Sequence, residues 1–282
     1  MGQIINGKEL ANKVKEEIKS YVLKRTNEGK SIPKIASILV GNDGGSIYYM
    51  NSQEKVALSL GLLFNKIELE ENIKEEELIN LIEALNKDTS IQGIMLQVPM
   101  PKHINENKVI NSISVDKDID CLTIESQGRL YTGIEGFLPC TPNSVVTLLK
   151  SLDLDLEGKE VVVLGRSNIV GKPVAQLLLN ENATVTICHS RTKNLKRVCK
   201  RADILVVAIG KPKFVDESYV KDGAIVIDVG TSSVEGRITG DLDFEKVIEK
   251  ASYVTPVPGG VGALTTTLLL KNACEALKKN EN

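Results

Sequence analysis

Residues 159–173, KEVVVLGRSNIVGKP, constrain the fold more than any other part of the chain. The segment opens with the apolar run 161–164, whose β-branched residues are typical of a parallel strand buried on both faces. Gly165 ends this run, and Gly171 with Pro173 begins a stretch with a helical pattern. A strand, a glycine turn and a helix N-terminus gather unpaired backbone N–H groups at one point. The segment therefore predicts an anion site suited to a dinucleotide pyrophosphate.

The glycine spacing of this turn differs from the common G-x-G-x-x-G fingerprint. Ser167 stands where the second glycine would be, and its hydroxyl can donate to a phosphate. A tight strand-to-helix turn that binds no ligand is the alternative interpretation, since such a motif is a weak signal by itself.

The residues after the next expected strand, 183–189, bear on the choice of cofactor. A free ribose 2′-hydroxyl usually meets an Asp or Glu near the end of this strand. Ser190 and Arg191 follow here instead, with Lys193 close by. Because a hydroxyl and a guanidinium suit a 2′-phosphate, we expect NADP rather than NAD.

Composition narrows the class of protein. With 282 residues, of which 42% are hydrophobic and 26% charged, the chain has the size and balance of about two globular domains. A net charge of −2 without a basic stripe argues against nucleic acid as a partner. No apolar run approaches the roughly 20 residues that span a membrane. Five cysteines without metal-type spacing fit reduced thiols in the cytoplasm, and we expect no metal site from the two histidines.

The chain before residue 140 alternates strand and helix patterns. Strands are expected at 34–40, 62–69 and 91–98, with helices at about 46–60 and 74–88 between them. Before the first of these strands, a helix is expected to begin after its N-cap Asn6 and to end before Gly29. Ser46 is the expected N-cap of the helix at about 46–60. This order predicts a parallel sheet covered by helices.

The chain after residue 140 shows the same alternation of strand and helix patterns. Thr141 is the expected cap of a helix with Pro142 at its first position. Strands are expected at 161–164, 184–188, 204–209, 224–229 and 253–255. A final helix at 264–279 follows, and it could return to pack on the first domain.

Four further segments carry polar groups after expected strands, where the ligands of such sheets gather. They are residues 44–55, 97–101, 116–120 and 255–265. Tyr49 and Gln53 in the first lie four residues apart and share a helix face, although a tyrosine packed in a core is the alternative. The second holds Gln97 beside two prolines. The third segment is acidic, and the alternative to a binding role for it is a solvated turn. The glycines and prolines of the fourth segment indicate backbone that closely approaches a ligand.

Taken together, these segments resemble one family. The motifs VGRSNIVGKP and TPVPGGVG, supported by ADILVVAIGKP and GAIVIDVG, make the chain similar to the methylenetetrahydrofolate dehydrogenase/methenyltetrahydrofolate cyclohydrolase family over essentially its whole length. The expected fold is α/β with two domains and a cleft between them. The resemblance implies an N-terminal βαβ folate-binding domain of residues 1–140 with 264–282, and a Rossmann-type NADP-binding domain of residues 141–263. It also implies a homodimer formed through the cofactor domain.

The resemblance further implies roles for single residues, with tetrahydrofolate derivatives as substrates. Asp120 would bind the pterin ring, whose aminopyrimidinone edge offers two parallel N–H donors to a carboxylate. Gln97 would lie beside the reacting bridge of the folate, and Tyr49 would stack on its rings. Gln53 completes this catalytic group. The other expected folate contacts are Leu96, Val98, Pro256, Pro258, Gly259, Gly260, Val261 and Gly262. The expected cofactor contacts are Gly165, Arg166, Ser167, Ser190, Arg191 and Thr231.

One departure from the family pattern affects the chemistry. The family carries Tyr-x-x-x-Lys on this helix, whereas Tyr49 is followed by Gln53, and Tyr48 by Ser52. Lys55 is near in sequence but points away from the face that Tyr49 and Gln53 share. Hydride transfer needs mainly positioning, whereas hydrolysis of the methenyl group needs a proton-transferring group such as a lysine. We therefore expect NADP-dependent dehydrogenase activity with weak or absent cyclohydrolase activity.

Three other functions remain open at this point. An enzyme with both activities would use water or Lys55 after a helix shift. A regulatory protein would bind folate or dinucleotide without catalysis. A different two-domain dehydrogenase, such as one acting on shikimate or an amino acid, would need a lysine or Lys–Asp base in the cleft, which the sequence does not place.

Overall fold

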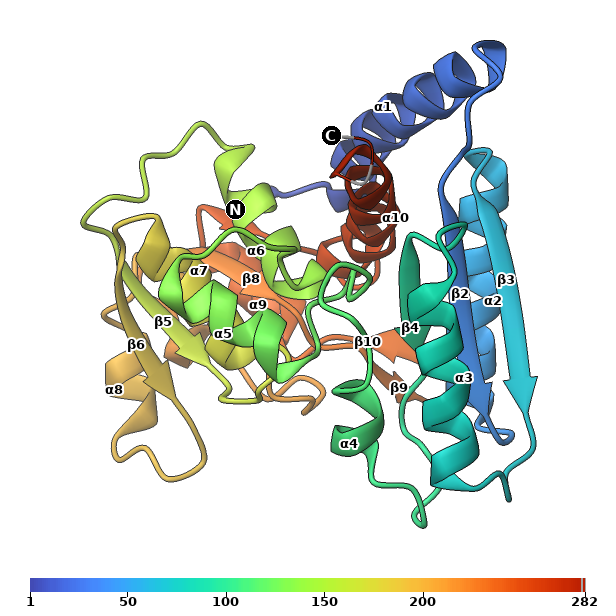
Figure 1. Ribbon diagram of the computed structural model, residues 1–282. Coiled ribbons are helices and arrows are strands. Elements are labelled where there is room, and N and C mark those ends of the chain that lie inside the picture. Colours follow the sequence, from blue (N-terminus) through green and yellow to red (C-terminus); the bar gives the residue numbers. More distant parts are fainter. Residues whose placement is uncertain (280, 282) are drawn as a thin grey trace. The chain divides into compact units, whose positions relative to one another are not determined.

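In the computed structural model, which describes residues 1–279 and 281, the chain forms two compact units, each with its own parallel sheet (Figure 1). The larger-sheet unit comprises residues 1–12 and 139–265, and the smaller-sheet unit comprises 13–138 and 266–282. The expected folate domain differs in that residues 1–12 lie in the larger-sheet unit, because β1 (Gln3–Ile4) pairs with β11 (Tyr253–Val254). Residues 280 and 282 of that expected domain lie outside the described residues.

The larger sheet has six parallel strands in the order β1-β11-β8-β7-β5-β6. Its four longer strands are β5 (Glu160–Leu164), β7 (Ile204–Val207) and β8 (Ile225–Asp228) in the interior and β6 (Thr184–Cys188) at one edge. The chain passes from β5 outward to β6 and then returns to the other side of β5 to form β7. This reversal opens a crevice at the carboxyl ends of β5 and β7, the usual ligand position in such sheets.

Short helices and a hairpin complete the larger-sheet unit. They are α6 (Cys140–Lys150), α7 (Gly171–Asn180), α8 (Leu195–Cys199), η1 (Glu217–Tyr219), α9 (Phe244–Lys250) and the antiparallel pair β9 (Ser232–Val234) and β10 (Arg237–Thr239). The hairpin was not expected from the sequence, because its short exposed strands lack an apolar run.

The start of α6 corrects one prediction. Thr141 is not the cap: the helix begins at Cys140, and extended Pro139 is the N-cap, whose carbonyl accepts from the N–H of Asn143. Pro142 therefore lies at the third helical position rather than the first. The missing N–H costs nothing there, because the first N–H groups of a helix have no intrahelical acceptor.

The smaller sheet has the parallel order β3-β2-β4, formed by β3 (Leu63–Leu69), β2 (Lys34–Val40) and β4 (Gly93–Leu96). Because the two connections run in opposite directions across β2 and such crossovers are right-handed, α2 (Gly44–Ser59) and α3 (Glu75–Lys87) cover opposite faces (Figure 1). Ala36, Ile38 and Val40 pack with α3 in one core. Ser37, between them on β2, faces the other side.

Before residue 140, one of the two predicted helix N-caps is observed and the other is not. Asn6 caps α1 (Gly7–Asn27) as expected, since its Oδ1 accepts from the N–H of Glu9 at 3.2 Å. Ser46 does not cap α2. Asp43 does, and its carboxylate accepts from both the N–H and the hydroxyl of Ser46 at 2.8 Å. Two short helices, α4 (Glu106–Ile110) and α5 (Ile124–Thr132), were not expected.

The last helix, α10 (Val261–Lys279), begins three residues before the predicted start at residue 264. Its later part belongs to the smaller-sheet unit. There the Nδ2 of Asn272 donates to the carbonyls of Ile119 and Leu138, at 2.8 and 3.3 Å. These bonds fix the later part of α10 to residues 119 and 138 of the same unit.

A buried lysine ties residues 116–120 to the end of α3. Lys117 is 8% exposed, and its Nζ donates to the carbonyls of Leu85 and Asp88 at 2.7 and 2.6 Å. Carbonyls at a helix C-terminus lack intrahelical donors, and a cation there is favourable. Burial nevertheless lowers the pKa of Lys117. The segment is thus a fixed part of the fold and not a solvated turn.

We predict that Lys117→Met lowers the free energy of unfolding by about 2–4 kcal/mol, because two buried carbonyls lose a charged donor. Lys108→Met is the matched control in the same unit. Lys108 forms an exposed ion pair with Glu75 at 2.7 Å, so its loss changes the unfolding free energy by less than about 1 kcal/mol. Urea denaturation of both variants measures this. Equal destabilisation by the two substitutions would contradict the anchoring role of Lys117.

Candidate functional site

Two glutamines meet on the face of the smaller sheet that α2 covers. Gln97 directly follows β4, and its Nε2 donates to the Oε1 of Gln53 on α2 at 2.9 Å and to the hydroxyl of Ser37 on β2 at 3.0 Å. The N–H of Gln97 also donates to the carbonyl of Ile38 at 2.9 Å. Both protons of the Gln97 amide are therefore used within the protein. Its own carbonyl oxygen is the atom left for a ligand.

Tyr49 lies one helical turn before Gln53 and shares its face of α2. Its side chain is 51% exposed and meets Tyr48 edge to face, with ring centroids 6.2 Å apart. The alternative of a tyrosine packed in a core is therefore wrong. Ser46 lies one turn earlier, and its hydroxyl, which bonds to Asp43, also lies 3.1 Å from the carbonyl oxygen of Val98. The start of α2 therefore lies against the loop after β4.

Residues 116–120 of the smaller-sheet unit form a loop that buried hydrogen bonds hold in place. Lys117 holds one end, and Asp118, 1% exposed, accepts from the N–H groups of Leu122 and Thr123 at 2.9 and 2.8 Å. Asp120 follows at the loop's end and is half-buried. The next residue, Cys121, has a φ of 57°, a left-handed conformation that is uncommon for a residue with a side chain. The backbone around Asp120 is thus strongly constrained.

The other expected folate contacts fall into two groups. On the smaller-sheet unit, Leu96 is buried at the end of β4, whereas Val98 is 43% exposed. The remaining six lie in the larger-sheet unit. Pro256, Pro258, Gly259 and Gly260 form the loop between β11 and α10, as expected, but Val261 and Gly262 are the first two residues of α10. The glycine-rich loop is therefore shorter than the sequence indicated.

Two backbone segments touch at the glycine turn of the larger sheet. Gly165 has a φ of 136°, and a Cβ at this position would collide with the carbonyl oxygen of Ala208 after β7. The N–H of Ala208 donates to the carbonyl of Leu164 at 2.8 Å. Only glycine allows this approach, so the turn after β5 and the loop after β7 form two sides of one crevice.

Ser167 completes the start of α7. Its hydroxyl oxygen accepts from the N–H groups of Val170 and Gly171, both at 3.2 Å. Two of the N–H groups expected to bind an anion are therefore already engaged. The hydroxyl proton of Ser167 remains the donor that this turn can offer to a phosphate.

A hollow of about 290 Å³ lies in this crevice, and four of the six expected cofactor contacts line it. These four are Gly165, Arg166, Ser167 and Ser190. Arg191 and Thr231 are exposed and lie outside this lining. His189 also lines the hollow, and its Nδ1 accepts from the N–H of Arg191 at 3.1 Å.

The sequence did not identify the far wall of the hollow. That wall comprises Leu195, Ala208, Ile209, Lys211 and Phe214. Lys211 places its Nζ 5.6 Å from the ring centroid of Phe214. For Ile209 and Lys211 the sequence did carry a signal, because the segment IGKP follows an apolar strand in the way that Gly165 does.

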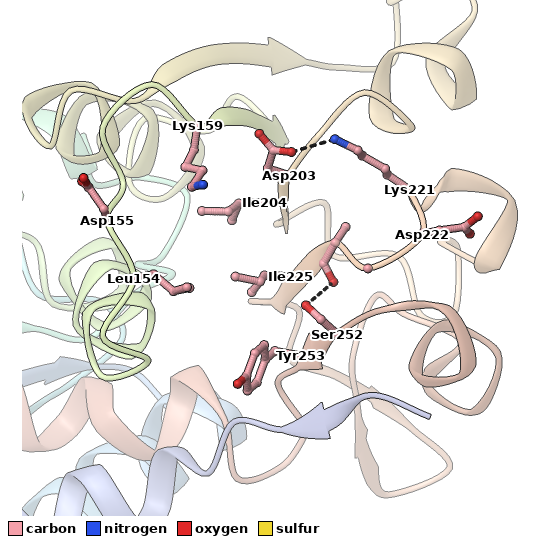
Figure 2. Close-up of a pocket in the computed structure, with 12 residues that line it drawn as sticks. Leu154, Asp155, Lys159, Asp203, Ile204, Lys221, Asp222, Ile225, Ser252 and Tyr253 are labelled. Carbon is pink, nitrogen blue, oxygen red and sulfur yellow. Dashed lines mark hydrogen bonds and ion pairs between the residues drawn. The ribbon is translucent and has the colours of Figure 1, made fainter.

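A second hollow of about 330 Å³ lies at the opposite, amino end of the larger sheet (Figure 2). Ile204, Ile225 and Tyr253 line it, beside the ion pair of Asp203 and Lys221 at 2.7 Å. None of the cofactor or folate residues expected from the sequence lines it.

Residues 1–279 and 281 hold no cluster of three metal-ligating side chains. No helix in the same residues combines the length and apolarity that a membrane span needs. All five cysteines are buried free thiols.

Comparison with known proteins agrees with this geometry. The catalytic-domain profile of the tetrahydrofolate dehydrogenase/cyclohydrolase family matches residues 5–120, and the NAD(P)-binding-domain profile of that family matches residues 139–281. "Bifunctional protein FolD" of Clostridium botulinum (strain Alaska E43 / Type E3) is 75% identical over 282 residues, which is the whole of both chains.

Two solved structures share the complete fold. The bifunctional FolD dehydrogenase/cyclohydrolase of Campylobacter jejuni has a TM-score of 0.96 at 43% identity, covering 99% of this chain and 100% of that one. The Trypanosoma brucei dehydrogenase-cyclohydrolase, solved with NADP and an inhibitor, has a TM-score of 0.94 at 35% identity and covers 100% of this chain and 99% of that one. The expected two-domain α/β fold is confirmed, and the chain belongs to the tetrahydrofolate dehydrogenase/cyclohydrolase family.

Proposed function

We propose that this protein oxidises 5,10-methylenetetrahydrofolate to 5,10-methenyltetrahydrofolate with NADP in one-carbon folate metabolism, and that it hydrolyses the methenyl product weakly or not at all. The observation that carries this proposal is Gln53. It occupies the position of the family's lysine and is hydrogen-bonded to Gln97.

The residues of the smaller-sheet unit suit the holding of a folate. The carboxylate of Asp120 accepts the two parallel N–H donors of the pterin edge. The exposed ring of Tyr49 offers a flat surface for stacking. The carbonyl oxygen of Gln97 is the atom of this side chain that would contact the ligand, since Gln53 and Ser37 accept both of its amide protons. NADP supplies the hydride acceptor, and the folate nitrogens supply the electrons that expel the hydride, so no side chain must take a proton.

Hydrolysis of the methenyl group makes a different demand, because water must be activated and protons moved. A glutamine amide cannot accept a proton near neutral pH, and general acid–base help is worth about 100- to 10,000-fold in rate. The neighbouring charged residues do not replace it. Glu54 pairs with Lys66 at 2.9 Å, and Lys55 is exposed on a different face of α2.

We predict that Gln53→Lys raises the rate of methenyltetrahydrofolate hydrolysis by about 100-fold or more, because it restores a group able to transfer protons. The new ammonium donates to the Gln97 oxygen after that amide rotates, while Ser37 can act as either donor or acceptor. Ser52→Lys is the matched control, since it places a lysine on the adjacent exposed position of the same helix and leaves hydrolysis unchanged. The decay of methenyltetrahydrofolate absorbance measures both variants.

Two results would count against this account. Rapid hydrolysis by the unmodified protein would favour the fully bifunctional alternative. No gain in Gln53→Lys, with its dehydrogenase rate retained, would mean that the missing amine does not explain the loss.

The preference for NADP over NAD rests on the loop after β6. Ser190 lines the crevice beside Arg166, Arg191 follows it, and no acidic residue stands at this strand end. We predict that Ser190→Asp lowers kcat/KM for NADP by about 100-fold and for NAD by far less, because a carboxylate repels a 2′-phosphate but accepts from a ribose hydroxyl. Ser233→Asp on the exposed strand β9 is the control. Steady-state kinetics with both cofactors measures the effect. An unchanged kcat/KM for NADP in Ser190→Asp would contradict the assignment.

The assembly and location follow from the same family assignment. We propose a homodimer formed through the NADP-binding domain, with tetrahydrofolate derivatives and not nucleic acid or membrane as partners. Five buried free thiols suit the reducing cytoplasm, where we place the protein.

A further inference from the structure

Three consecutive N–H groups of the crevice converge on one buried carboxylate. Asp241, 0% exposed, accepts from the N–H groups of Ile209, Gly210 and Lys211 at 2.7, 3.0 and 2.7 Å. These residues form the loop after β7, and Ile209 with Lys211 lines the hollow. Asp241 itself is absent from that lining. It therefore acts on the crevice only through the backbone that it holds.

A second buried carboxylate holds Asp241. Asp228, the last residue of β8 and 3% exposed, accepts from the N–H groups of Gly230, Asp241 and Leu242 at 2.9, 3.0 and 3.0 Å. Its own N–H donates to the hydroxyl of Thr255 at 2.7 Å. The end of β8 thus fixes the segment after the hairpin β9–β10, and that segment fixes the loop after β7.

Two glycines make this arrangement possible. A Cβ at Gly240 would collide with the carboxylate of Asp228, and one at Gly230 would collide with that of Asp241. Each carboxylate therefore sits directly against glycine backbone. Burial raises the pKa of Asp228 to about 6, although its three N–H donors oppose this rise. Two carboxylates are kept in a dry region, and backbone N–H groups of neighbouring loops hold them there.

We propose that Asp241, held by Asp228, is a positioning residue for the cofactor: it orders the 209–211 loop before NADP binds. A carboxylate that accepts from three successive N–H groups fixes the orientation of all three peptides. The side chains of Ile209 and Lys211 are consequently presented to the crevice in one arrangement. Without that acceptor, the loop would become ordered only when the cofactor binds. The free energy of this ordering would then weaken the affinity for the cofactor. This inference rests on the proposed function in taking the hollow as the NADP site.

The test is a fluorescence titration of NADPH into the unmodified protein and the Asp241→Asn variant. We expect the Kd for NADPH to rise about tenfold or more, since an amide cannot replace a carboxylate that accepts three buried N–H groups. The KM for methylenetetrahydrofolate stays within about twofold, because no folate contact changes. A purely structural role would move neither constant in the folded fraction.

Asp203→Asn is the matched control. Asp203 also accepts a backbone N–H, from Glu160 at 3.0 Å, and lies at the opposite end of the same sheet (Figure 2). It loses the same charge, and we expect its Kd for NADPH to be unchanged. If Asp241→Asn folds and binds NADPH as tightly as Asp203→Asn does, the positioning role is wrong. If the unmodified protein does not bind NADPH, the proposed function fails instead.

Hydrogen exchange on the unmodified, cofactor-free protein decides the question if Asp241→Asn does not fold. The amides of Ile209, Gly210 and Lys211 should be protected to the same degree as those of β7. Exchange as fast as that of the exposed hairpin turn at 235–236 would show that the loop is not ordered in advance, and would overturn the proposal.

Discussion

The cofactor side of this protein depends on the close contact between the backbone at Gly165 and the loop after β7, where a Cβ at residue 165 would collide with the carbonyl oxygen of Ala208. Parallel strands buried on both faces leave polar chemistry only at their ends. The contact brings two such ends so close that the turn after β5 and the loop after β7 become opposite walls of one crevice. Ser167, whose oxygen is engaged by α7, and Ser190 after β6 then face the same space. A side chain at residue 165 would separate the walls before any ligand arrived.

The smaller-sheet unit is organised differently, because its buried polar groups fix the positions of exposed ones. Lys117 and Asp118 face inward to helix carbonyls and loop N–H groups, and Asp120 is left half-buried at the end of the loop they anchor. Gln97 donates its two amide protons to Gln53 and Ser37. In each case the inward bonds determine which polar atom remains for a substrate, so the exposed atoms are oriented without a ligand being present.

The sequence predicted those features that depend on neighbouring residues. The strand 34–40 was found with its observed bounds, and the strand first expected at 183–189 is one residue shorter at each end, because apolar and β-branched runs are local signals. The cap of α2 was assigned to Ser46, whereas Asp43 is the cap, because either residue satisfies the local pattern and only the loop geometry decides. Asp241 and Asp228 were missed for another reason. Asp241 bonds to residues about 30 positions away, and no pattern within one element reveals such a pairing.

Under the proposed function, the single substitution at Gln53 would separate two reactions on a shared scaffold. An amide and an ammonium of similar reach both hydrogen-bond to Gln97, so the fold around α2, the stacking surface of Tyr49 and the loop of Asp120 need not change. What changes is the direction of the bond: Gln97 donates to Gln53, whereas it would have to accept from a lysine. A reaction that requires a held geometry tolerates this reversal. A reaction that requires a side chain to accept and return a proton at that position would not, because a neutral amide neither accepts nor releases a proton readily near pH 7.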